Sequence, residues 1–206
     1  VLVNESGQLY LSISTMMKSK SNQFKNRKST YCFNPVELSK DVLISSFEAA
    51  RWSPSPFNFQ PWRFIVFKRG ETLFSKLISS MATRNKIWAK NASFLVVICS
   101  KKLKRDSRLS NTKSPYSKYD DVVEYSVGMS IGLFLAELSF TGLQAHQMRG
   151  FDREAVSQDL SLSEEINPLV IMAIGQEISV DSEIFNDFDS VMKNRLDVVR
   201  VRKPIH

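Results

Sequence analysis

The stretch from Ala49 to Trp62, AARWSPSPFNFQPW, constrains the fold most, because it joins a helix to a strand through a turn that cannot be helical. Pro54 and Pro56 end the helix, since each lacks a backbone N–H and disfavours helix in the residue before it. The apolar run 64–67 then predicts a buried strand over 63–68. Before the turn, apolar residues keep the spacing of an amphipathic helix at Val42, Leu43, Phe47 and Ala50.

The turn itself is rich in polar and aromatic side chains. Aromatic rings frame a set of hydroxyl and amide groups that come from Ser53, Ser55, Asn58 and Gln60. Such a turn suits a flat heterocyclic ligand, because rings and prolines can form its walls while amides and backbone groups orient it. The same composition also occurs in loops whose polar side chains hydrogen-bond only their own backbone. The residue types alone leave both interpretations open.

Length and composition predict a single globular protein. The chain has 206 residues, enough for one large core and few for two domains. Hydrophobic residues make up 43% and charged residues 24%, which argues against general disorder. Cys32 and Cys99 have no metal-binding spacing, so we expect reduced thiols in a cytoplasmic protein. The most apolar stretch, 127–143, contains Glu137 and therefore does not predict a membrane span.

Positive charge is concentrated near the N-terminus and in the middle of the chain. The net charge is +7. Residues 1–23 are interpreted as an N-terminal extension, and the stretch 101–118 is basic and serine-rich, as in an exposed loop. Solvated surface segments explain both, so no nucleic acid is expected. A basic module that binds nucleic acid or another polyanion remains the alternative outside the enzymes.

The remaining sequence alternates helices and short strands. It predicts a helix over about 71–83, a strand over 94–100, a long helix over 119–141, a strand over 143–148, a helix from Asp152 to about 160 and a strand over 168–175. Gly128 and Gly132 predict that another helix approaches the long helix closely, either in the core or across a dimer axis. Gly142 suits the end of that helix.

Residues for nucleophilic or metal catalysis are scarce. The two histidines are His146 and His206, and His146 within a strand is more typical of a packed residue than of a base. No P-loop, CxxC, GxSxG or HExxH motif occurs. A protein whose bound cofactor carries the chemistry needs none of these groups.

The segment PSPFNFQPW resembles the PSxxNxQPW signature of the flavin-dependent nitroreductase family. Weaker blocks in the family's order support the resemblance, which extends over residues 24–202. They are RKSTYCF at 27–33, NKIW at 85–88, the helix ending in Gly142–Leu143, Gly150–Phe151–Asp152, and the pair Lys193 and Arg195.

The resemblance implies an FMN site and assigns residues to it. These are Arg27, Lys28, Ser29, Tyr31, Pro54, Ser55, Pro56, Asn58, Gln60, Asn85, Arg149, Gly150, Lys193 and Arg195. By resemblance, Arg27 and Ser29 bind the FMN phosphate and ribityl chain with help from the tail pair. Asn85 bonds the isoalloxazine edge, and the amides of Arg149 and Gly150 face flavin N5. Tyr31 stands where the family commonly has Arg or Lys, so we expect different tuning of the flavin.

The implied fold is α+β: a mainly antiparallel sheet wrapped by helices and completed by tail exchange in a homodimer, with residues 24–206 as one FMN-binding domain. FMN would lie in the dimer groove, with contacts from both subunits. The implied function is electron transfer from NAD(P)H to a nitroaromatic, quinone or flavin acceptor by a ping-pong mechanism. A relative that oxidises a peptide-derived or heterocyclic substrate is the second enzymatic alternative.

Overall fold

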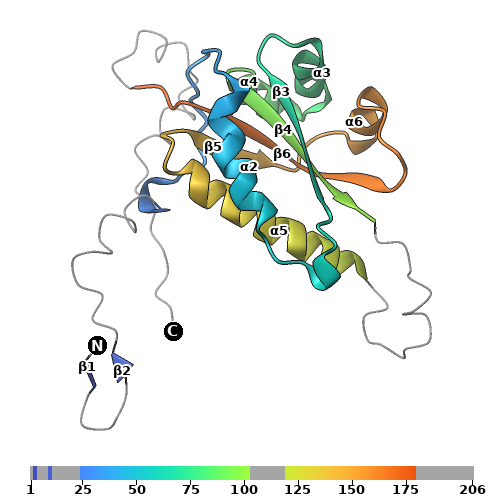
Figure 1. Cartoon of the computed structure of the whole chain (residues 1–206). Helices are drawn as coiled ribbons and strands as arrows, with labels where there is room; N and C mark the ends of the chain where they lie inside the picture. Colours follow the sequence, from blue (N-terminus) through green and yellow to red (C-terminus); the bar gives the residue numbers. More distant parts are fainter. Residues whose placement is uncertain (1, 4–8, 11–23, 103–118, 180–206) are drawn as a thin grey trace.

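The centre of the molecule is a four-stranded antiparallel sheet, seen in a computed structural model that describes residues 2–3, 9–10, 24–102 and 119–179 (Figure 1). Across the sheet the strands are β3 (Trp62–Lys68), β4 (Phe94–Lys101), β6 (Ile166–Gly175) and β5 (Gln144–Met148). Strand β4 is buried on both faces, which explains its continuous apolar run. The short strands β1 (Leu2–Val3) and β2 (Leu9–Tyr10) pair separately. The predicted α+β class and antiparallel sheet are confirmed.

Helices cover both faces of this sheet and make it the middle of three layers (Figure 1). On one face lie η1 (Lys40–Leu43), α2 (Ile44–Arg51) and α5 (Tyr119–Leu138); on the other lie α3 (Thr72–Ser80), α4 (Thr83–Ala89) and α6 (Arg153–Asp159). Side chains along β4 alternate between the two cores, as the pleat requires. Val96 and Ile98 join the α2–α5 core, whereas Val97 and Cys99 join the α3–α4–α6 core.

Local signals set several helix ends as the sequence predicts. Helix α2 ends at Arg51, before Pro54. The Asp152 carboxylate caps α6 by accepting a hydrogen bond from the Ala155 N–H at 3.0 Å. Gly142, with φ of +78°, follows α5 in the left-handed conformation that glycine adopts readily.

The helix predicted over about 71–83 is confirmed as α3 but ends earlier, because the chain leaves the helical conformation at Met81 (φ −77°, ψ 155°) and a second helix, α4, begins at Thr83. Met81 instead forms an antiparallel bridge with Phe151, and the Ala82 N–H donates to the Gly150 carbonyl at 2.9 Å. Backbone bonds to this distant turn outweigh local helix propensity. The break places α4 against the turn that follows β5.

Within the described ranges, no helix makes the predicted close contact at Gly128 and Gly132. A Cβ atom added at either glycine would meet no atom of the described residues within 4 Å, and both glycines are exposed on α5. The side of α5 that carries these two glycines is therefore open in the described part of the chain.

No helix of the described ranges is both long enough and apolar enough to cross a membrane.

Cys99 lies in the α3–α4–α6 core, where burial raises the pKa of its thiol to about 12 because the thiolate is disfavoured there. At about pH 8 the thiol is therefore neutral and covered, and we expect it to resist alkylation until the protein unfolds. Mass spectrometry after brief iodoacetamide treatment, with and without urea, measures this. Equal modification of Cys99 in both samples would contradict the expectation.

Candidate functional site

The segment 26–33 lies along β5 and the end of β6. The Lys28 N–H donates to Gln144 Oε1 at 3.0 Å, and Gln144 Nε2 donates to the Asn26 carbonyl at 3.4 Å. The Lys28 ammonium forms an ion pair with Glu177 at 2.6 Å. These contacts give Lys28 a structural role, because they fasten the segment that carries Arg27 and Ser29 to the sheet.

Tyr31 belongs to a layer of packed rings. Its ring meets Trp88 edge-on, with centroids 5.3 Å apart, and meets His146 edge-on at 4.5 Å. The rings of Trp88 and His146 stack at 4.4 Å, and His146 Nδ1 lies 2.9 Å from the Thr30 carbonyl oxygen. His146 is thus a packed residue, as its place in a strand predicts. The layer connects the segment 26–33 to α4 and β5.

Asn85 and the turn at Arg149–Gly150 meet because of the break between α3 and α4. Asn85 Nδ2 donates to the Gly150 carbonyl at 3.1 Å, beside the bond from Ala82 to the same oxygen. Arg149 and Gly150 are both exposed, and neither donates its backbone N–H to another described residue. Two consecutive N–H groups therefore stand open beside the Asn85 amide.

Position 150 tolerates glycine better than any residue with a side chain. A Cβ atom there would lie 2.9 Å from Asn85 Nδ2, which is too close for an undisturbed contact, and 3.5 Å from Ala82 Cβ. We expect Gly150→Ala to push the Asn85 amide off the Gly150 carbonyl and to lower the free energy of unfolding by about 0.5–1.5 kcal/mol, the usual contribution of one hydrogen bond. Urea denaturation measures this change.

The matched control for that prediction is the same substitution in an Asn85→Ala background. Because the crowded amide is then absent, the cost of Gly150→Ala should shrink, and the two changes should be non-additive. An unchanged cost in the Asn85→Ala protein would show that the contact is not the cause.

The polar turn after α2 is bonded mainly to itself. It contains the short helix η2 (Pro56–Asn58). The Gln60 N–H donates to Ser55 Oγ at 2.9 Å, and Gln60 Nε2 donates to Asn58 Oδ1 at 3.0 Å. Phe57, Asn58 and Gln60 have φ values of 52°, 54° and 48°. Each costs roughly 1 kcal/mol in this left-handed region. The internal bonds therefore hold a strained backbone in one shape.

This turn lies across the sheet from the region around Asn85 and Gly150. It leads into β3, whereas the other region adjoins β5, and β3 and β5 are opposite edges of the sheet, roughly 14 Å apart at the usual strand spacing. Along the strands, Trp62 pairs with Ser100 at one end, whereas Lys68 pairs with Phe94 at the other. Gln144, which holds Lys28, pairs with Gly175 near the Lys68 end.

The predicted site residues thus fall into two groups within one chain. The first group, near β5 and α4, contains Arg27, Lys28, Ser29, Tyr31, Asn85, Arg149 and Gly150. The second group, beyond the end of α2, contains Pro54, Ser55, Pro56, Asn58 and Gln60. Lys193 and Arg195 lie outside the described residues.

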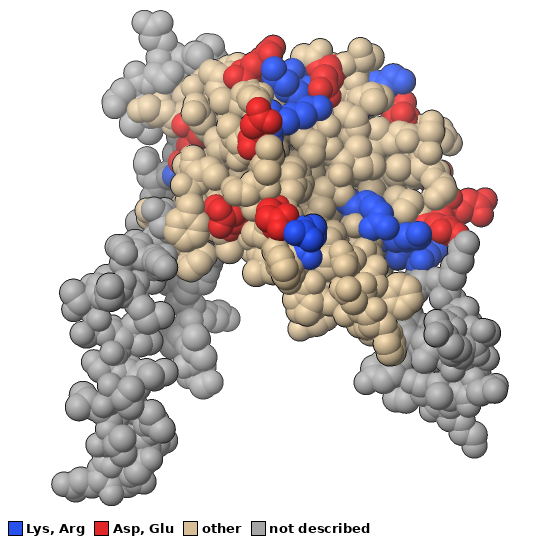
Figure 2. All heavy atoms as spheres, viewed as in Figure 1, with Lys and Arg blue, Asp and Glu red and all other residues tan. Residues whose placement is uncertain are grey.

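Large apolar side chains are exposed around the second group and along α5. Trp52 is 73% exposed and Phe57 is 74% exposed, while Tyr125 and Phe140 on the α5 side are 67% and 50% exposed. In Figure 2 the lower part of the described surface, around η2, carries few charged side chains. Exposed aromatic side chains in such a sparsely charged area are typical of a surface that binds another protein.

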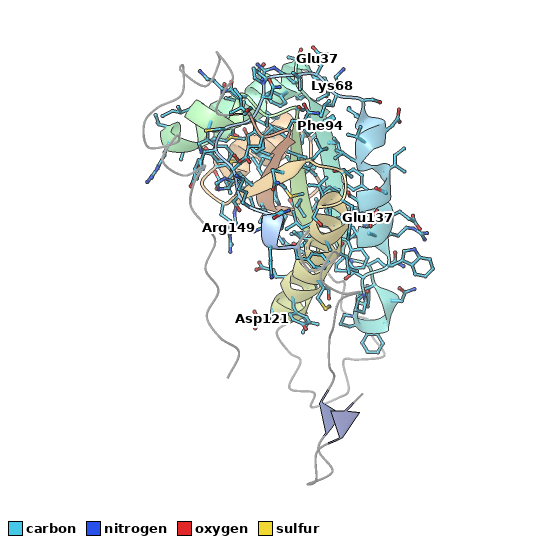
Figure 3. The ribbon with its side chains drawn as sticks, turned by 90° about the vertical axis from the view of Figure 1, so that its left-hand side faces the viewer. Glu37, Lys68, Phe94, Asp121, Glu137 and Arg149 are labelled. Carbon is cyan, nitrogen blue, oxygen red and sulfur yellow. The ribbon has the colours of Figure 1, made fainter. Side chains whose placement is uncertain are left out.

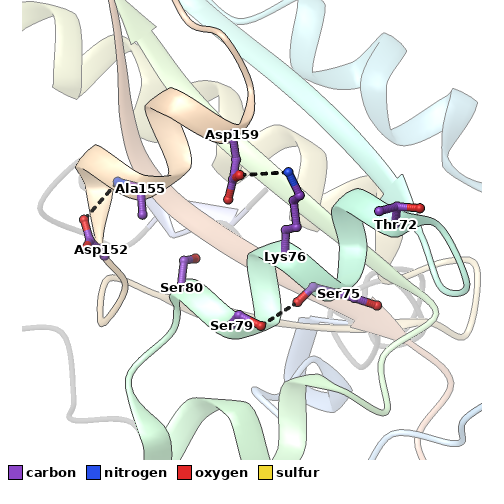
Figure 4. Close-up of a pocket in the computed structure, with 8 residues that line it drawn as sticks. All are labelled: Thr72, Ser75, Lys76, Ser79, Ser80, Asp152, Ala155 and Asp159. Atoms are coloured by element: carbon purple, nitrogen blue, oxygen red, sulfur yellow. Dashed lines mark hydrogen bonds and ion pairs between the residues drawn. The ribbon is translucent and has the colours of Figure 1, made fainter.

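The groove between α3 and α6 is a separate feature, shown in Figure 4. It has a volume of about 540 Å³. Its charged groups are already engaged, since Lys76 pairs with Asp159 at 3.2 Å and Asp152 caps α6. No group of acidic, histidine or cysteine residues suited to a metal ion is found in the described part of the chain. The open amides beside Asn85 are therefore the better candidate for ligand binding.

Comparisons with known proteins agree with this geometry. The model of the nitroreductase family matches residues 24–176. The chain is 26% identical over 192 residues to YdgI of Bacillus subtilis, provisionally named an NAD(P)H nitroreductase, covering 76% of this chain and 90% of that protein. It is also 26% identical over 183 residues to the oxygen-insensitive NAD(P)H nitroreductase of Salmonella typhimurium, covering 72% and 84%.

A solved structure described as an oxidoreductase containing FMN has the same fold, with a TM-score of 0.75 at 20% identity over 99% of this chain and 94% of that chain. The family match covers most of the chain and includes both groups of site residues. Lys193 and Arg195 lie beyond it. The chain belongs to the nitroreductase family.

Proposed function

We propose that this chain binds FMN and transfers electrons from NAD(P)H to an electron-poor acceptor, such as a nitroaromatic compound, a quinone or another flavin. The observation that carries the proposal is the pair of open N–H groups at Arg149 and Gly150 beside Asn85, in a member of the nitroreductase family. Bound FMN supplies the chemistry, because its ring accepts two electrons from a reduced nicotinamide and passes them to an acceptor.

The residues of the first group offer the donor types that FMN requires. The amides of Arg149 and Gly150, which donate to no described residue, can donate to the ring edge. Asn85 uses its Nδ2 internally, which leaves Oδ1 as an acceptor for a ring N–H. Arg27 and Ser29 offer a guanidinium fork and a hydroxyl, a combination suited to a phosphate.

We infer that the site is completed by a second copy of the chain. The polar turn is across the sheet from the first group, yet its exposed aromatics and the open face of α5 form an apolar surface. In a two-fold dimer the turn of one subunit can reach the first group of its partner. The exchange of C-terminal tails, with Lys193 and Arg195 at the FMN phosphate, is part of the same proposal. NAD(P)H and the acceptor would use one face in turn, so we expect ping-pong kinetics.

Replacing Arg27 with Ala is expected to weaken FMN binding tenfold or more, because a hydrogen bond to a charged group contributes about 1.5–3 kcal/mol. Flavin absorbance after equilibrium dialysis measures the change. Arg69→Ala, which removes an arginine from the β3–α3 turn, is the control and should retain FMN. Full flavin occupancy in the Arg27→Ala protein would remove Arg27 from the site.

A further inference from the structure

The Asn85–Gly150 contact is flanked by positively charged side chains. Arg84 and Lys86 are the immediate neighbours of Asn85 on α4, and Arg149 directly precedes Gly150. The bonds from Ala82 and Asn85 to the Gly150 carbonyl, at 2.9 and 3.1 Å, hold these two short segments together. Three cationic residues therefore lie next in the chain to the two residues of the contact that joins α4 to the turn after β5.

These cations are not neutralised by the described residues. Arg84 and Arg149 are exposed and Lys86 is half-buried, and none of the three forms an ion pair or a side-chain hydrogen bond with another described residue. Figure 3 labels Arg149 at the rim of the domain, where it directly follows the edge strand β5. By contrast, four other lysines of the described ranges form ion pairs: Lys28, Lys40, Lys68 and Lys76.

Acidic groups near the three cations are few. The segment 82–90 contains Arg84, Lys86 and Lys90 and no acidic residue. On the facing turn the nearest acid is Asp152, whose carboxylate accepts a hydrogen bond from the Ala155 N–H at the start of α6. A group of like charges kept together without carboxylates costs repulsion in the free protein, and an anionic ligand removes that cost.

We infer that Arg84, Lys86 and Arg149 bind the phosphate groups of the nicotinamide dinucleotide, with preference for the 2′-phosphorylated form, NADPH, over NADH. The inference rests on the proposed function, because it places the cations beside the amides that face the flavin ring. A 2′-phosphate adds a charge of about −1.5 to −2 at neutral pH, so each cation attracts NADPH more strongly than NADH. The gain should fall as salt screens the exposed pairs.

The test compares the wild-type protein with the double variant Arg84→Gln/Lys86→Gln. The control is Lys40→Gln/Lys76→Gln, which removes the same two charges from ion pairs on other surfaces, with Glu71 and Asp159. Calorimetric titration of the oxidised FMN-loaded proteins with 2′,5′-ADP and with 5′-AMP, which lacks only the 2′-phosphate, reports binding directly. Anaerobic reduction by NADPH and NADH gives the ratio of the two kcat/KM values.

Wild-type protein is expected to bind 2′,5′-ADP more tightly than 5′-AMP and to prefer NADPH over NADH, with a smaller preference at high salt. The double variant should lower the NADPH-to-NADH ratio about threefold to tenfold, since each exposed pair contributes a few tenths to one kcal/mol. The control variant should leave the ratio unchanged. Equal binding of the two nucleotides by the wild-type protein would overturn the inference. An equal fall of the NADPH-to-NADH ratio in the control variant would also overturn it.

FMN content, measured by absorbance in each sample, separates this inference from the proposed function. If the protein takes up no FMN yet distinguishes the two nucleotides, and the double variant does not, the anion site is supported and the proposed flavin function is refuted. A protein that binds FMN without distinguishing the nucleotides would keep the function and refute the anion site. Failure of both would overturn both.

Discussion

Phe134→Ala is expected to lower the free energy of unfolding by about 3–5 kcal/mol, the usual cost of truncating a buried phenylalanine. Phe134 on α5 is fully buried in the α2–α5 core. Its ring stacks on Phe64 of β3 at a centroid distance of 6.0 Å and contacts Phe47 of α2 at 5.0 Å. Three elements therefore lose their common contact, and the ring packing leaves little room for collapse into the cavity.

The matched control is Ile44→Ala, because Ile44 on α2 is 62% exposed and alanine favours the helical conformation. That change should alter the stability of a single chain by no more than about 0.5 kcal/mol. Urea denaturation of both variants at one fixed protein concentration measures the difference, because assembly also contributes to stability. A loss below about 1 kcal/mol for Phe134→Ala would contradict the packing of this core.

Two variants that each lose FMN are expected to recover binding when their chains are mixed. The first variant carries Arg27→Ala, and the second carries Asn58→Ala with Gln60→Ala. If each site combines the first group of one subunit with the turn of the other, a mixed dimer has one doubly altered site and one intact site. Random mixing then restores about a quarter of the sites.

Recovery should follow unfolding and joint refolding of the two chains, and flavin absorbance after dialysis measures it. Each variant refolded alone is the control and should remain depleted of FMN. No recovery in the mixture, together with proof of mixed dimers by mass spectrometry, would mean that one chain supplies the whole site. Recovery well above a quarter would also disagree with a site shared in this way.

Apolar patterns predicted most of the sheet and its covering helices. Strands β3 and β4 follow from runs that are too short and too β-rich for buried helices, and the ends of α2 and α6 follow from Pro54 and Asp152. These features depend on residues that are neighbours in the sequence, so they can be predicted from the sequence alone. The break at Met81 cannot be predicted in this way, because its cause is the bridge to Phe151, which comes near only in the folded chain.

The site residues assigned by resemblance remain a prediction, and the sequence does not give their arrangement. Residues around Asn85 and Gly150 meet as the resemblance implies, whereas Asn58 and Gln60 bond within their own turn and lie across the sheet. No local pattern states on which side of a sheet a turn will lie. Strained φ values at Phe57 and Gln60 also leave no sequence signal, since these residue types do not favour the left-handed region.

The proposed flavin chemistry is measured by anaerobic titration of the protein with NADPH, after reconstitution with FMN and dialysis, followed by visible absorbance. A flavin-dependent oxidoreductase should be yellow, retain FMN, be bleached by the reduced nicotinamide, and regain its colour when a quinone or nitroaromatic acceptor is added. A colourless protein that retains no FMN would contradict the proposed function, all the more if it bound nucleic acid with strong salt dependence.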